Sequence, residues 1–407
     1  MTEPTVAIIG TGQAGLQVAV TLRELKYEGR VLLVGDEPHA PYRRPPLSKS
    51  YLLGEAEAEE LALSSDTFFA LHRIELVKGK RATGIDRAER VVHLADGSAV
   101  GYEHLVLATG ARNRPLNAPG AELRNVFYLR TLDDAAALRV KMATAKNVVV
   151  IGAGFIGLEF AAVAGKQGLD VSVLEAADRP MPRAVSKTMS AIFAREYEKL
   201  GVRLSFGSRV VRLLGEDSSV CGVETADGRI LPADLVVIGI GVLPNVELAA
   251  NCELTVEDGV LVDDFLQTSD PAISAIGDVA AHMNRYGHGQ RLRLESVQNA
   301  CDQARCVARR IVGRPAAYDA VPWFWTDQGM LKLQMAGLST AGCQEVVRGD
   351  TTGTACSVFL FHNGKLVCVE SLNRPTDHMV ARRLLAKGAA VTPQHAADMN
   401  LELKSLL

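Results

Sequence analysis

The feature that most constrains this chain is a glycine-rich motif that occurs twice, with the first glycines of the two copies 142 residues apart. In the first copy, an apolar run from Thr5 to Ile9 leads into G-T-G-Q-A-G at Gly10 to Gly15. In the second, Asn147 to Ile151 leads into G-A-G-F-I-G at Gly152 to Gly157. Each motif is followed by a helix-like segment and by a second β-rich run that leads to an acidic residue. Strand, tight turn, helix and strand in this order predict two βαβ units with parallel sheets.

The three glycines of each copy have different mechanical roles. The first permits a tight turn out of the strand, the second lets a pyrophosphate approach the backbone, and the third lets the helix pack closely on the sheet. The helix N-terminus then offers free N–H groups and the positive end of its dipole to the phosphates. A single glycine-rich turn can be purely structural, but two complete copies predict two dinucleotide sites. These sites are formed by Gly10, Gly12 and Gly15, and by Gly152, Gly154 and Gly157.

An acidic residue follows the second strand of each copy. Asp36 and Glu175 lie 21 and 18 residues after the third glycine of their copies, close to the spacing of about 20 for an acid that binds a nucleotide ribose. A carboxylate such as that of Glu175 binds a free 2′-hydroxyl and repels a 2′-phosphate, so NADH is favoured over NADPH. Arg179 and Arg183 follow Glu175 and can contact the adenosine phosphates or ribose. Because one hydride donor needs one site, the other site should hold a flavin or a second nucleotide.

Composition excludes several other classes of protein. With 407 residues the chain predicts two or three domains, and its net charge of −3 gives no support for nucleic-acid binding. No uninterrupted apolar run approaches the roughly 18 residues of a membrane span. The chain reaches an apolar strand by Val6 without a basic flank or a cleavage site, so we expect a cytoplasmic protein.

The cysteines and histidines predict neither disulfides nor a metal site. The seven cysteines are odd in number and scattered, which is typical of reduced thiols. Cys301 and Cys306 are five residues apart on an expected helix and would face different directions. The chain contains no C-x-x-C, and the nine histidines show no helical pairing typical of metal ligands.

Three further motifs occur in a recognisable order: L-V-L-A-T-G at Leu105 to Gly110, V-V-I-G-I-G at Val236 to Gly241, and I-S-A-I-G-D at Ile273 to Asp278. Over essentially the whole chain, this order resembles the glutathione-reductase-like flavoproteins with two dinucleotide-binding domains. The resemblance implies an α/β fold in which two Rossmann-like domains bind FAD and NAD(P)H, the N-terminal one FAD, and Asp278 bonds the ribityl chain of the flavin.

The C-terminal region predicts a smaller α+β domain. Asn363-Gly364 is a two-residue hairpin signal, and a helix is expected from Pro375 to Gly388. Strands are expected at Leu331 to Gly337, Ala355 to Phe361 and Leu366 to Leu372. The predicted domains are 1–108 with 241–320 for FAD, 109–240 for NAD, and 321–407 for the C-terminal α+β domain.

A narrower resemblance is carried by R-R-P-P-L-S-K (43–49), E-S-V-Q-N-A (295–300) and P-W-F-W-T-D-Q (322–328). These segments resemble the NADH-dependent ferredoxin reductases of bacterial cytochrome P450 and aromatic dioxygenase systems, which are putidaredoxin-reductase-like. The resemblance implies FAD contacts at Ala14, Asp36, Lys49, Ala82, Arg130, Asp278 and Val297. It also implies that Lys49 and Glu159 form a charge pair near the flavin ring and that Trp325 stacks beside the ring.

The motifs and the resemblance together give one set of candidate residues for each cofactor. Arg43 can either reach a pyrophosphate or belong to a plain solvated turn. The candidate catalytic residues are Lys49, Glu159 and Trp325. The candidate FAD contacts are Gly10, Gly12, Ala14, Gly15, Asp36, Arg43, Lys49, Ala82, Ala108, Thr109, Gly110, Arg130, Asp278, Val297 and Trp325. The candidate NAD contacts are Gly152, Gly154, Ile156, Gly157, Glu159, Glu175, Arg183, Gly239 and Gly241.

The absence of cysteine between Asp36 and Leu61 excludes the thiol chemistry of disulfide reductases and of NADH peroxidases. We therefore expect hydride transfer from NADH to flavin N5, followed by single-electron transfer to a 2Fe–2S ferredoxin. Seven arginines against two acids lie between Arg285 and Arg314. Arg305 and Arg309 share a helix face that is either a docking surface for an acidic ferredoxin or a plain solvated face.

Two other functions stay open. A flavin oxidase or quinone reductase would need no protein partner, and a redox-signalling protein like apoptosis-inducing factor would form a long-lived complex with NADH.

Overall fold

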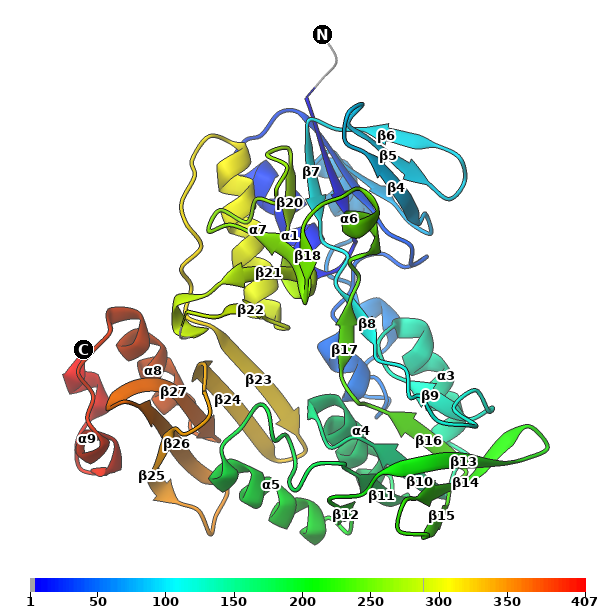
Figure 1. Cartoon of the computed structure of the whole chain (residues 1–407), viewed down its shortest axis with the longest axis vertical. Helices are drawn as coiled ribbons and strands as arrows, with labels where there is room; N and C mark the ends of the chain where they lie inside the picture. Colours follow the sequence, from blue (N-terminus) through cyan, green and yellow to red (C-terminus); the bar gives the residue numbers. More distant parts are fainter. Residues whose placement is uncertain (1–3, 288) are drawn as a thin grey trace. The chain divides into compact units, whose positions relative to one another are not determined.

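The computed structural model describes residues 4–287 and 289–407, and the chain divides into two compact units (Figure 1). The first unit contains residues 1–43, 61–112 and 243–322. The second unit contains residues 44–60, 113–242 and 323–407. The second unit holds both the second parallel sheet and the C-terminal sheet. A division into two units does not test the boundaries of three domains, so these boundaries stay a prediction.

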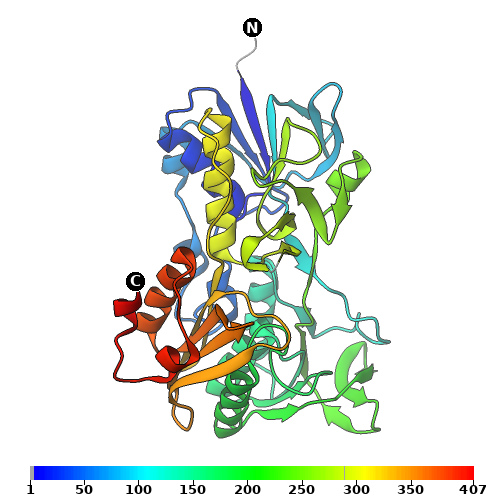
Figure 2. The ribbon, with the colours of Figure 1, turned by 60° about the vertical axis from the view of Figure 1, so that its left-hand side comes forward.

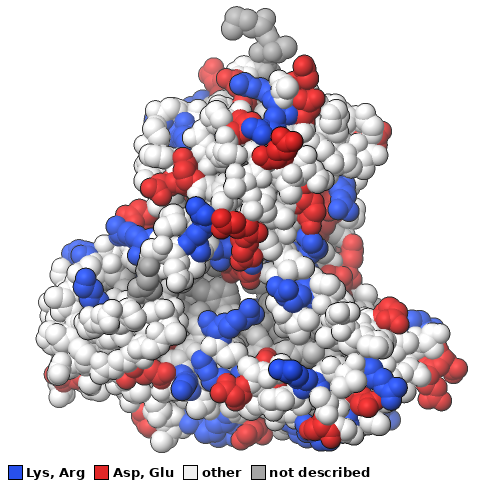
Figure 3. All heavy atoms as spheres, viewed as in Figure 1, with Lys and Arg blue, Asp and Glu red and all other residues white. Residues whose placement is uncertain are grey.

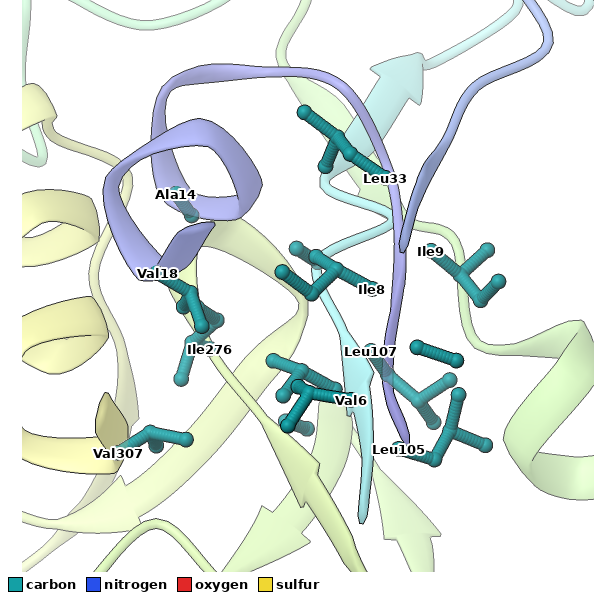
Figure 4. Packing of buried hydrophobic residues seen from close by; sticks show 14 of the residues in the cluster. Val6, Ile8, Ile9, Ala14, Val18, Leu33, Leu105, Leu107, Ile276 and Val307 are labelled. Atoms are coloured by element: carbon teal, nitrogen blue, oxygen red, sulfur yellow. The ribbon is translucent and has the colours of Figure 1, made fainter. Parts of the chain in front are cut away.

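The first unit is built on a parallel five-stranded sheet in the order β20-β7-β1-β2-β3. Its strands are β1 (Thr5–Ile9), β2 (Arg30–Val34), β3 (Ile74–Val77), β7 (His104–Leu107) and β20 (Ile273–Ala275). Helix α7 (Val297–Ile311) lies beside α1 (Gln13–Glu24) in both ribbon views (Figures 1 and 2). Val18, Ile276 and Val307 gather with Val6 and Ile8 of β1 in the core that Figure 4 shows.

Smaller elements complete the first unit. An antiparallel sheet is formed by β4 (Ala82–Asp86), β5 (Val91–Leu94) and β6 (Ala99–Gly101). A second, mixed sheet is formed by β18 (Val256–Glu257), β19 (Gly259–Val262), β21 (Ala280–Met283) and β22 (Arg291–Arg293). In this sheet β19 and β21 run parallel, and the other neighbours run antiparallel. The short helices are α2 (Asp66–Leu71), α6 (Glu247–Asn251), η3 (Gly277–Val279) and η4 (Arg285–Gly287). Strands β8 (Ala111–Asn113) and β17 (Val242–Pro244) lie where the chain passes between the units.

The second unit repeats the parallel sheet, here in the order β12-β11-β10-β16-β9. Its strands are β9 (Val126–Tyr128), β10 (Asn147–Ile151), β11 (Asp170–Leu174), β12 (Arg203–Ser205) and β16 (Leu235–Ile238). Its helices are α3 (Leu132–Met142), α4 (Phe155–Lys166) and α5 (Lys187–Lys199), with η1 (Pro45–Ser48) in the 44–60 segment and η2 (Ala58–Leu61) at its end. An antiparallel sheet is formed by β13 (Val210–Glu216), β14 (Ser219–Thr225) and β15 (Ile230–Pro232).

The C-terminal part of the second unit is an antiparallel sheet in the order β23-β24-β27-β26-β25. Asn363 and Gly364 form the predicted hairpin turn, with φ of 49° and 74°, and α8 (Pro375–Lys387) is capped by Gly388, whose φ is 61°. The strands are β23 (Trp323–Gln328), β24 (Leu331–Gly337), β25 (Gln344–Asp350), β26 (Ala355–His362) and β27 (Lys365–Leu372), and the helices are α8 (Pro375–Lys387), α9 (Pro393–Ala397) and η5 (Leu403–Leu406).

Two expectations from composition can be compared with these elements. None of the helices in the described part of the chain is long and apolar enough to cross a membrane. Positive and negative side chains are interspersed over the face of the molecule that Figure 3 shows.

Candidate active site

The N-terminal glycine-rich turn is shaped by two steric constraints and leaves one position open. Gly10 has φ of +116°, and a Cβ on it would lie 2.1 Å from the carbonyl oxygen of Ala108. A Cβ on Gly15 would lie 1.9 Å from the carbonyl oxygen of Gly10. A Cβ on Gly12, by contrast, would meet no described atom within 4 Å, although Gly12 is the N-cap of α1. The packing of the protein therefore requires the first and third glycines, and the open second position fits a group bound against the helix N-terminus.

The second glycine-rich turn has the same geometry. Gly152 has φ of +103°, and its Cβ would lie 2.4 Å from the carbonyl oxygen of Gly239. A Cβ on Gly157 would lie 2.2 Å from the carbonyl oxygen of Gly152, while at Gly154 the nearest described atom is 3.8 Å away. Helices α1 and α4 both begin without a side-chain cap or an acidic first turn, so their N–H groups stay available for phosphates. Both cradles therefore fit a dinucleotide.

The two ribose-binding candidates are offset by one residue. Glu175 follows β11 directly, and its two carboxylate oxygens accept hydrogen bonds from the backbone N–H groups of Ala153 (2.7 Å) and Ala177 (2.9 Å). After β2 the corresponding place is taken by Gly35, whose Cβ would lie 2.2 Å from the Thr11 Oγ1. The acid therefore comes one residue later, at Asp36, which is exposed.

The loop after Glu175 uses its two arginines differently. Arg179 donates to three carbonyl oxygens of its own loop and to the Ser190 hydroxyl, so its guanidinium holds the loop in place. The Nη2 of Arg183 lies 3.6 Å from the Cβ position of Gly241. Ile156 is 43% exposed beside the glycine-rich turn, which is unusual for an isoleucine and fits a surface that a nucleotide covers. Arg183 is thus the better of the two arginines for a nucleotide contact.

In the first unit, the predicted flavin residues Ala14 and Asp278 lie close together. Gly277 has φ of +72°, and its Cβ position is 3.2 Å from the Cβ of Ala14, which brings Asp278 to the start of α1. Val297 is the first residue of α7, and the N-cap Ser296 accepts a hydrogen bond from the backbone N–H of Asn299 at 3.0 Å. The E-S-V-Q-N-A segment therefore contains a helix N-terminus.

A neighbouring asparagine, which the sequence interpretation did not single out, holds the turn at 108–110. Thr109 Oγ1 donates to the carbonyl oxygen of Asn245 at 2.8 Å, and Asn245 Nδ2 donates to the carbonyl oxygen of Thr109 at 2.8 Å. The backbone N–H of Asn245 donates to the carbonyl oxygen of Gly110 at 2.9 Å. The L-P-N sequence after the V-V-I-G-I-G motif was the available signal, but only the fold shows what it contacts.

Two other flavin candidates of the first unit have less specific surroundings. Ala82 is buried at the start of β4, and the segment before it is joined to the loop at Asp36 by a 2.8 Å hydrogen bond from the Lys80 N–H to the Gly35 carbonyl. Arg43 is exposed, and its N–H donates to the carbonyl oxygen of Leu61 at 2.9 Å. Both interpretations of Arg43 stay open.

The remaining flavin candidates, Lys49, Arg130 and Trp325, belong to the second unit. Lys49 Nζ lies 2.6 Å from Glu159 Oε2, which confirms the predicted charge pair, and the Glu159 side chain is only 4% exposed. Trp325 is half-buried and stacks against Trp323 with ring centres 5.5 Å apart. The carbonyl oxygen of Arg130 accepts a 2.8 Å hydrogen bond from Arg44.

Neither a metal site nor a redox thiol pair accompanies these residues. Within residues 4–287 and 289–407, no cluster of histidine, cysteine, aspartate and glutamate could hold a metal ion, and all the cysteines are free. Cys301 and Cys306 both lie on α7, and burial raises the pKa of both thiols. Protonated thiols are poor nucleophiles, so these cysteines are poorly suited to redox chemistry.

Comparison with known proteins agrees with this geometry. Residues 4–304 match the pyridine nucleotide-disulphide oxidoreductase family, and residues 323–407 match the reductase C-terminal domain. Rhodocoxin reductase of Rhodococcus erythropolis is 50% identical over 400 residues, which cover 98% of this chain and 93% of the relative. Putidaredoxin reductase of Pseudomonas putida is 39% identical over 407 residues, which cover 99% of this chain and 96% of the relative.

Solved structures show the same relationship. The ferredoxin reductase for the CYP199A2 system from Rhodopseudomonas palustris superposes with a TM-score of 0.96 at 50% identity, covering 98% of this chain and 99% of that one. A covalent complex of putidaredoxin reductase with putidaredoxin gives a TM-score of 0.96 at 38% identity, covering 100% of this chain and 98% of that one. The chain therefore belongs to the pyridine nucleotide-disulphide oxidoreductase family and carries the reductase C-terminal domain in addition.

Proposed function

We propose that this protein is a FAD-containing, NADH-dependent ferredoxin reductase that delivers single electrons to a 2Fe–2S ferredoxin of an oxygenase system such as a cytochrome P450. The observation that carries the proposal is the pair of dinucleotide cradles, each with an open second glycine, in a chain without a redox cysteine pair. The relatives named above are reductases of redoxins or ferredoxins, and one of them is held covalently to putidaredoxin.

The residues of the chain would bind the two cofactors, orient them and neutralise their negative charge. The N-termini of α1 and α4 hold the two pyrophosphates, and Asp36 and Glu175 orient the adenosine riboses. Asp278 and the N-terminus of α7 serve the ribityl chain and the pyrimidine edge of the flavin, where a positive helix end stabilises negative charge. When bound, FAD supplies the chemistry of accepting a hydride and releasing electrons one at a time.

Preference for NADH follows from the fixed position of Glu175. Two backbone N–H groups hold its carboxylate, so it keeps one orientation and its remaining lone pairs can accept a ribose 2′-hydroxyl. A 2′-phosphate at the same place would meet a negative charge that cannot swing away, which disfavours NADPH.

The proposed docking surface for the ferredoxin is smaller than the arginine count of the sequence indicates. Arg285, Arg291 and Arg293 form ion pairs with nearby acids, and Arg310 is partly buried and donates to Ser274. On α7, Arg305 and Arg309 are both exposed, and Arg305 also pairs with Asp302 at 2.8 Å. These two arginines, four residues apart, form the positive face that an acidic ferredoxin would meet.

The function is tested on purified protein loaded with FAD. The protein should be yellow, NADH should bleach the flavin faster than NADPH does, and NADH-dependent cytochrome c reduction should require an added 2Fe–2S protein. Equal steady-state rates without any protein partner would instead identify a flavin oxidase or quinone reductase. A reduced complex that persists in air for many minutes would favour a redox-signalling role like that of apoptosis-inducing factor. We further propose that the protein works in the cytoplasm, where NADH is available and thiols stay reduced.

A further inference from the structure

Two segments that are far from each other and from α4 in the sequence converge on Glu159 of that helix. Its Oε2 forms an ion pair with Lys49 Nζ at 2.6 Å and accepts a 2.5 Å hydrogen bond from the Ser48 hydroxyl. Both residues belong to the R-R-P-P-L-S-K segment. Its Oε1 accepts a 2.6 Å hydrogen bond from the hydroxyl of Thr326, in the P-W-F-W-T-D-Q segment. A carboxylate that is 4% exposed is costly unless charge and hydrogen bonds compensate for the lost water, and these three donors do so.

Thr326 is itself held by a buried hydrogen-bond chain. Gln328 Nε2 donates to Thr326 Oγ1 at 3.2 Å, and the Tyr197 hydroxyl lies 2.8 Å from Gln328 Oε1 and 2.6 Å from the Leu158 carbonyl oxygen. Thr326, Gln328 and Tyr197 are all at most 1% exposed. Since a threonine hydroxyl has a single hydrogen, the bond received from Gln328 leaves that hydrogen for Glu159. The chain thus orients the Thr326 donor toward the carboxylate.

The strand β23 explains why the motif has this composition. Successive side chains of a strand point to opposite faces, so Phe324, Thr326 and Gln328 face α4, where Phe324 packs on Phe155 with ring centres 4.6 Å apart. Trp325 points to the other face. One strand therefore supplies both the aromatic flavin candidate and, on its other side, the support for Glu159.

We propose that Thr326, oriented by Gln328 and Tyr197, is a positioning residue that keeps the Glu159 carboxylate paired with Lys49 during hydride transfer. The proposal rests on the proposed function, in which Glu159 and Lys49 lie beside the reacting rings. Thr326 itself touches neither cofactor in this role. Its removal leaves Glu159 Oε1 buried without a donor, and the carboxylate then turns away from Lys49 to find another partner.

The kinetic test compares Thr326→Val, which keeps the shape of the side chain but removes the hydroxyl, with Thr326→Ser, which keeps the hydroxyl. Anaerobic stopped-flow mixing of the FAD-loaded protein with NADH gives the rate constant of flavin bleaching and the Kd for NADH. For Thr326→Val we expect a rate constant lower by on the order of 10-fold, the effect of one lost hydrogen bond to a charged group. The Kd for NADH should change by a smaller factor than the rate constant, because Glu175 and the second cradle are intact, and Thr326→Ser should restore the rate.

Tyr197→Phe provides a second variant that acts further along the same chain, so the test does not depend on Thr326→Val folding. It should lower the bleaching rate in the same direction by a smaller factor. Tyr128→Phe is the matched control. The Tyr128 hydroxyl lies outside this hydrogen-bond chain and accepts a 2.9 Å hydrogen bond from the Leu116 N–H. It should bleach at the wild-type rate.

Crystal structures of the variants supply a readout that does not depend on turnover. In Thr326→Val the Glu159 carboxylate should have left its position beside Lys49, and in Thr326→Ser it should have stayed. The positioning role would be overturned if the Glu159 carboxylate or the bleaching rate were unchanged in Thr326→Val. It would also be overturned if Thr326→Val and Thr326→Ser lowered the bleaching rate equally. If NADH fails to bleach the wild-type flavin, the proposed function fails instead, whatever position the structures show for Glu159.

Discussion

Glu370 offers a quantitative prediction about how the stability of the second unit depends on pH. Its side chain on β27 is fully buried, and its two carboxyl oxygens accept hydrogen bonds from the backbone N–H and the hydroxyl of Ser186, the N-cap of α5, at 2.7 and 2.6 Å. Burial raises the pKa of Glu370 from 4.5 to about 7, against the opposing effect of the two bonds from Ser186. Protonation of Glu370 is therefore coupled to folding.

The sign follows from which state holds the proton more tightly. The unfolded chain releases the Glu370 proton near pH 4.5, whereas the folded chain keeps it up to about pH 7 because its pKa is raised. The stabilising contribution is therefore fully present below pH 4.5, falls between pH 4.5 and about 7, and is absent above that range. A shift of this size corresponds to about 3 kcal/mol of unfolding free energy, as an upper limit.

Glu370→Gln removes the titrating group but keeps an acceptor for the Ser186 N–H. We expect the difference in urea unfolding midpoint between wild type and Glu370→Gln to change steadily from pH 5 to pH 7.5, with the wild type losing stability relative to the variant. Glu345→Gln is the matched control at the same helix end. Burial pulls the pKa of Glu345 upward, but hydrogen bonds from Thr188 and Lys187 outweigh it and lower the pKa, so its contribution is lost only in more acidic solution. Parallel curves for wild type and Glu370→Gln over this range would refute the reasoning.

Three further predictions concern the cofactors and the partner. Gly12→Arg should abolish flavin content in folded protein, whereas Gly154→Arg should keep the flavin and lose its bleaching by NADH, both read from absorption spectra. Glu175→Ala should narrow the preference for NADH over NADPH by on the order of 10-fold in kcat/KM, the effect of losing one charge-assisted hydrogen bond; an unchanged ratio would remove Glu175 from cofactor selection. Arg305→Glu combined with Arg309→Glu should raise the KM for an acidic ferredoxin most strongly at low salt, while NADH-dependent ferricyanide reduction stays at the wild-type rate.

The sequence was sufficient for elements whose boundaries are set by local chemistry. The strands Thr5–Ile9 and Asn147–Ile151 have the predicted bounds because these apolar runs end at glycines that must turn. The hairpin at Asn363 and the stop at Gly388 were likewise predictable, since both need positive φ. The strand Gln344–Asp350, the antiparallel inserts and the short β23 were not predicted, because their patterns become strands only against a neighbouring strand.

The same distinction applies to the candidate site. The glycines and the acids Asp36 and Glu175 were found from spacing, and Lys49 with Glu159 from resemblance, but the L-P-N sequence at Asn245 does not indicate that this residue bonds to Thr109. Charge counting was the least reliable guide. Most of the arginines between 285 and 314 are paired or partly buried, so net charge along the chain overestimates the charge that a partner meets.

The two glutamates that the mechanism and the stability argument depend on show that the partners of a buried carboxyl group decide its role. Glu159 and Glu370 are both nearly inaccessible to water, and both accept hydrogen bonds from hydroxyl groups. Glu159 also has Lys49 Nζ at 2.6 Å, so an ion pair as well as hydrogen bonds compensates for its lost contact with water. Glu370 receives two hydrogen bonds from Ser186 and has no ion pair among the described residues, so burial dominates and its pKa is raised. Removing Lys49 should therefore leave Glu159, like Glu370, with hydrogen bonds as its only compensation for burial. A bleaching rate in Lys49→Met that is lower than in wild type at neutral pH would reveal that change, and an equal rate would contradict it.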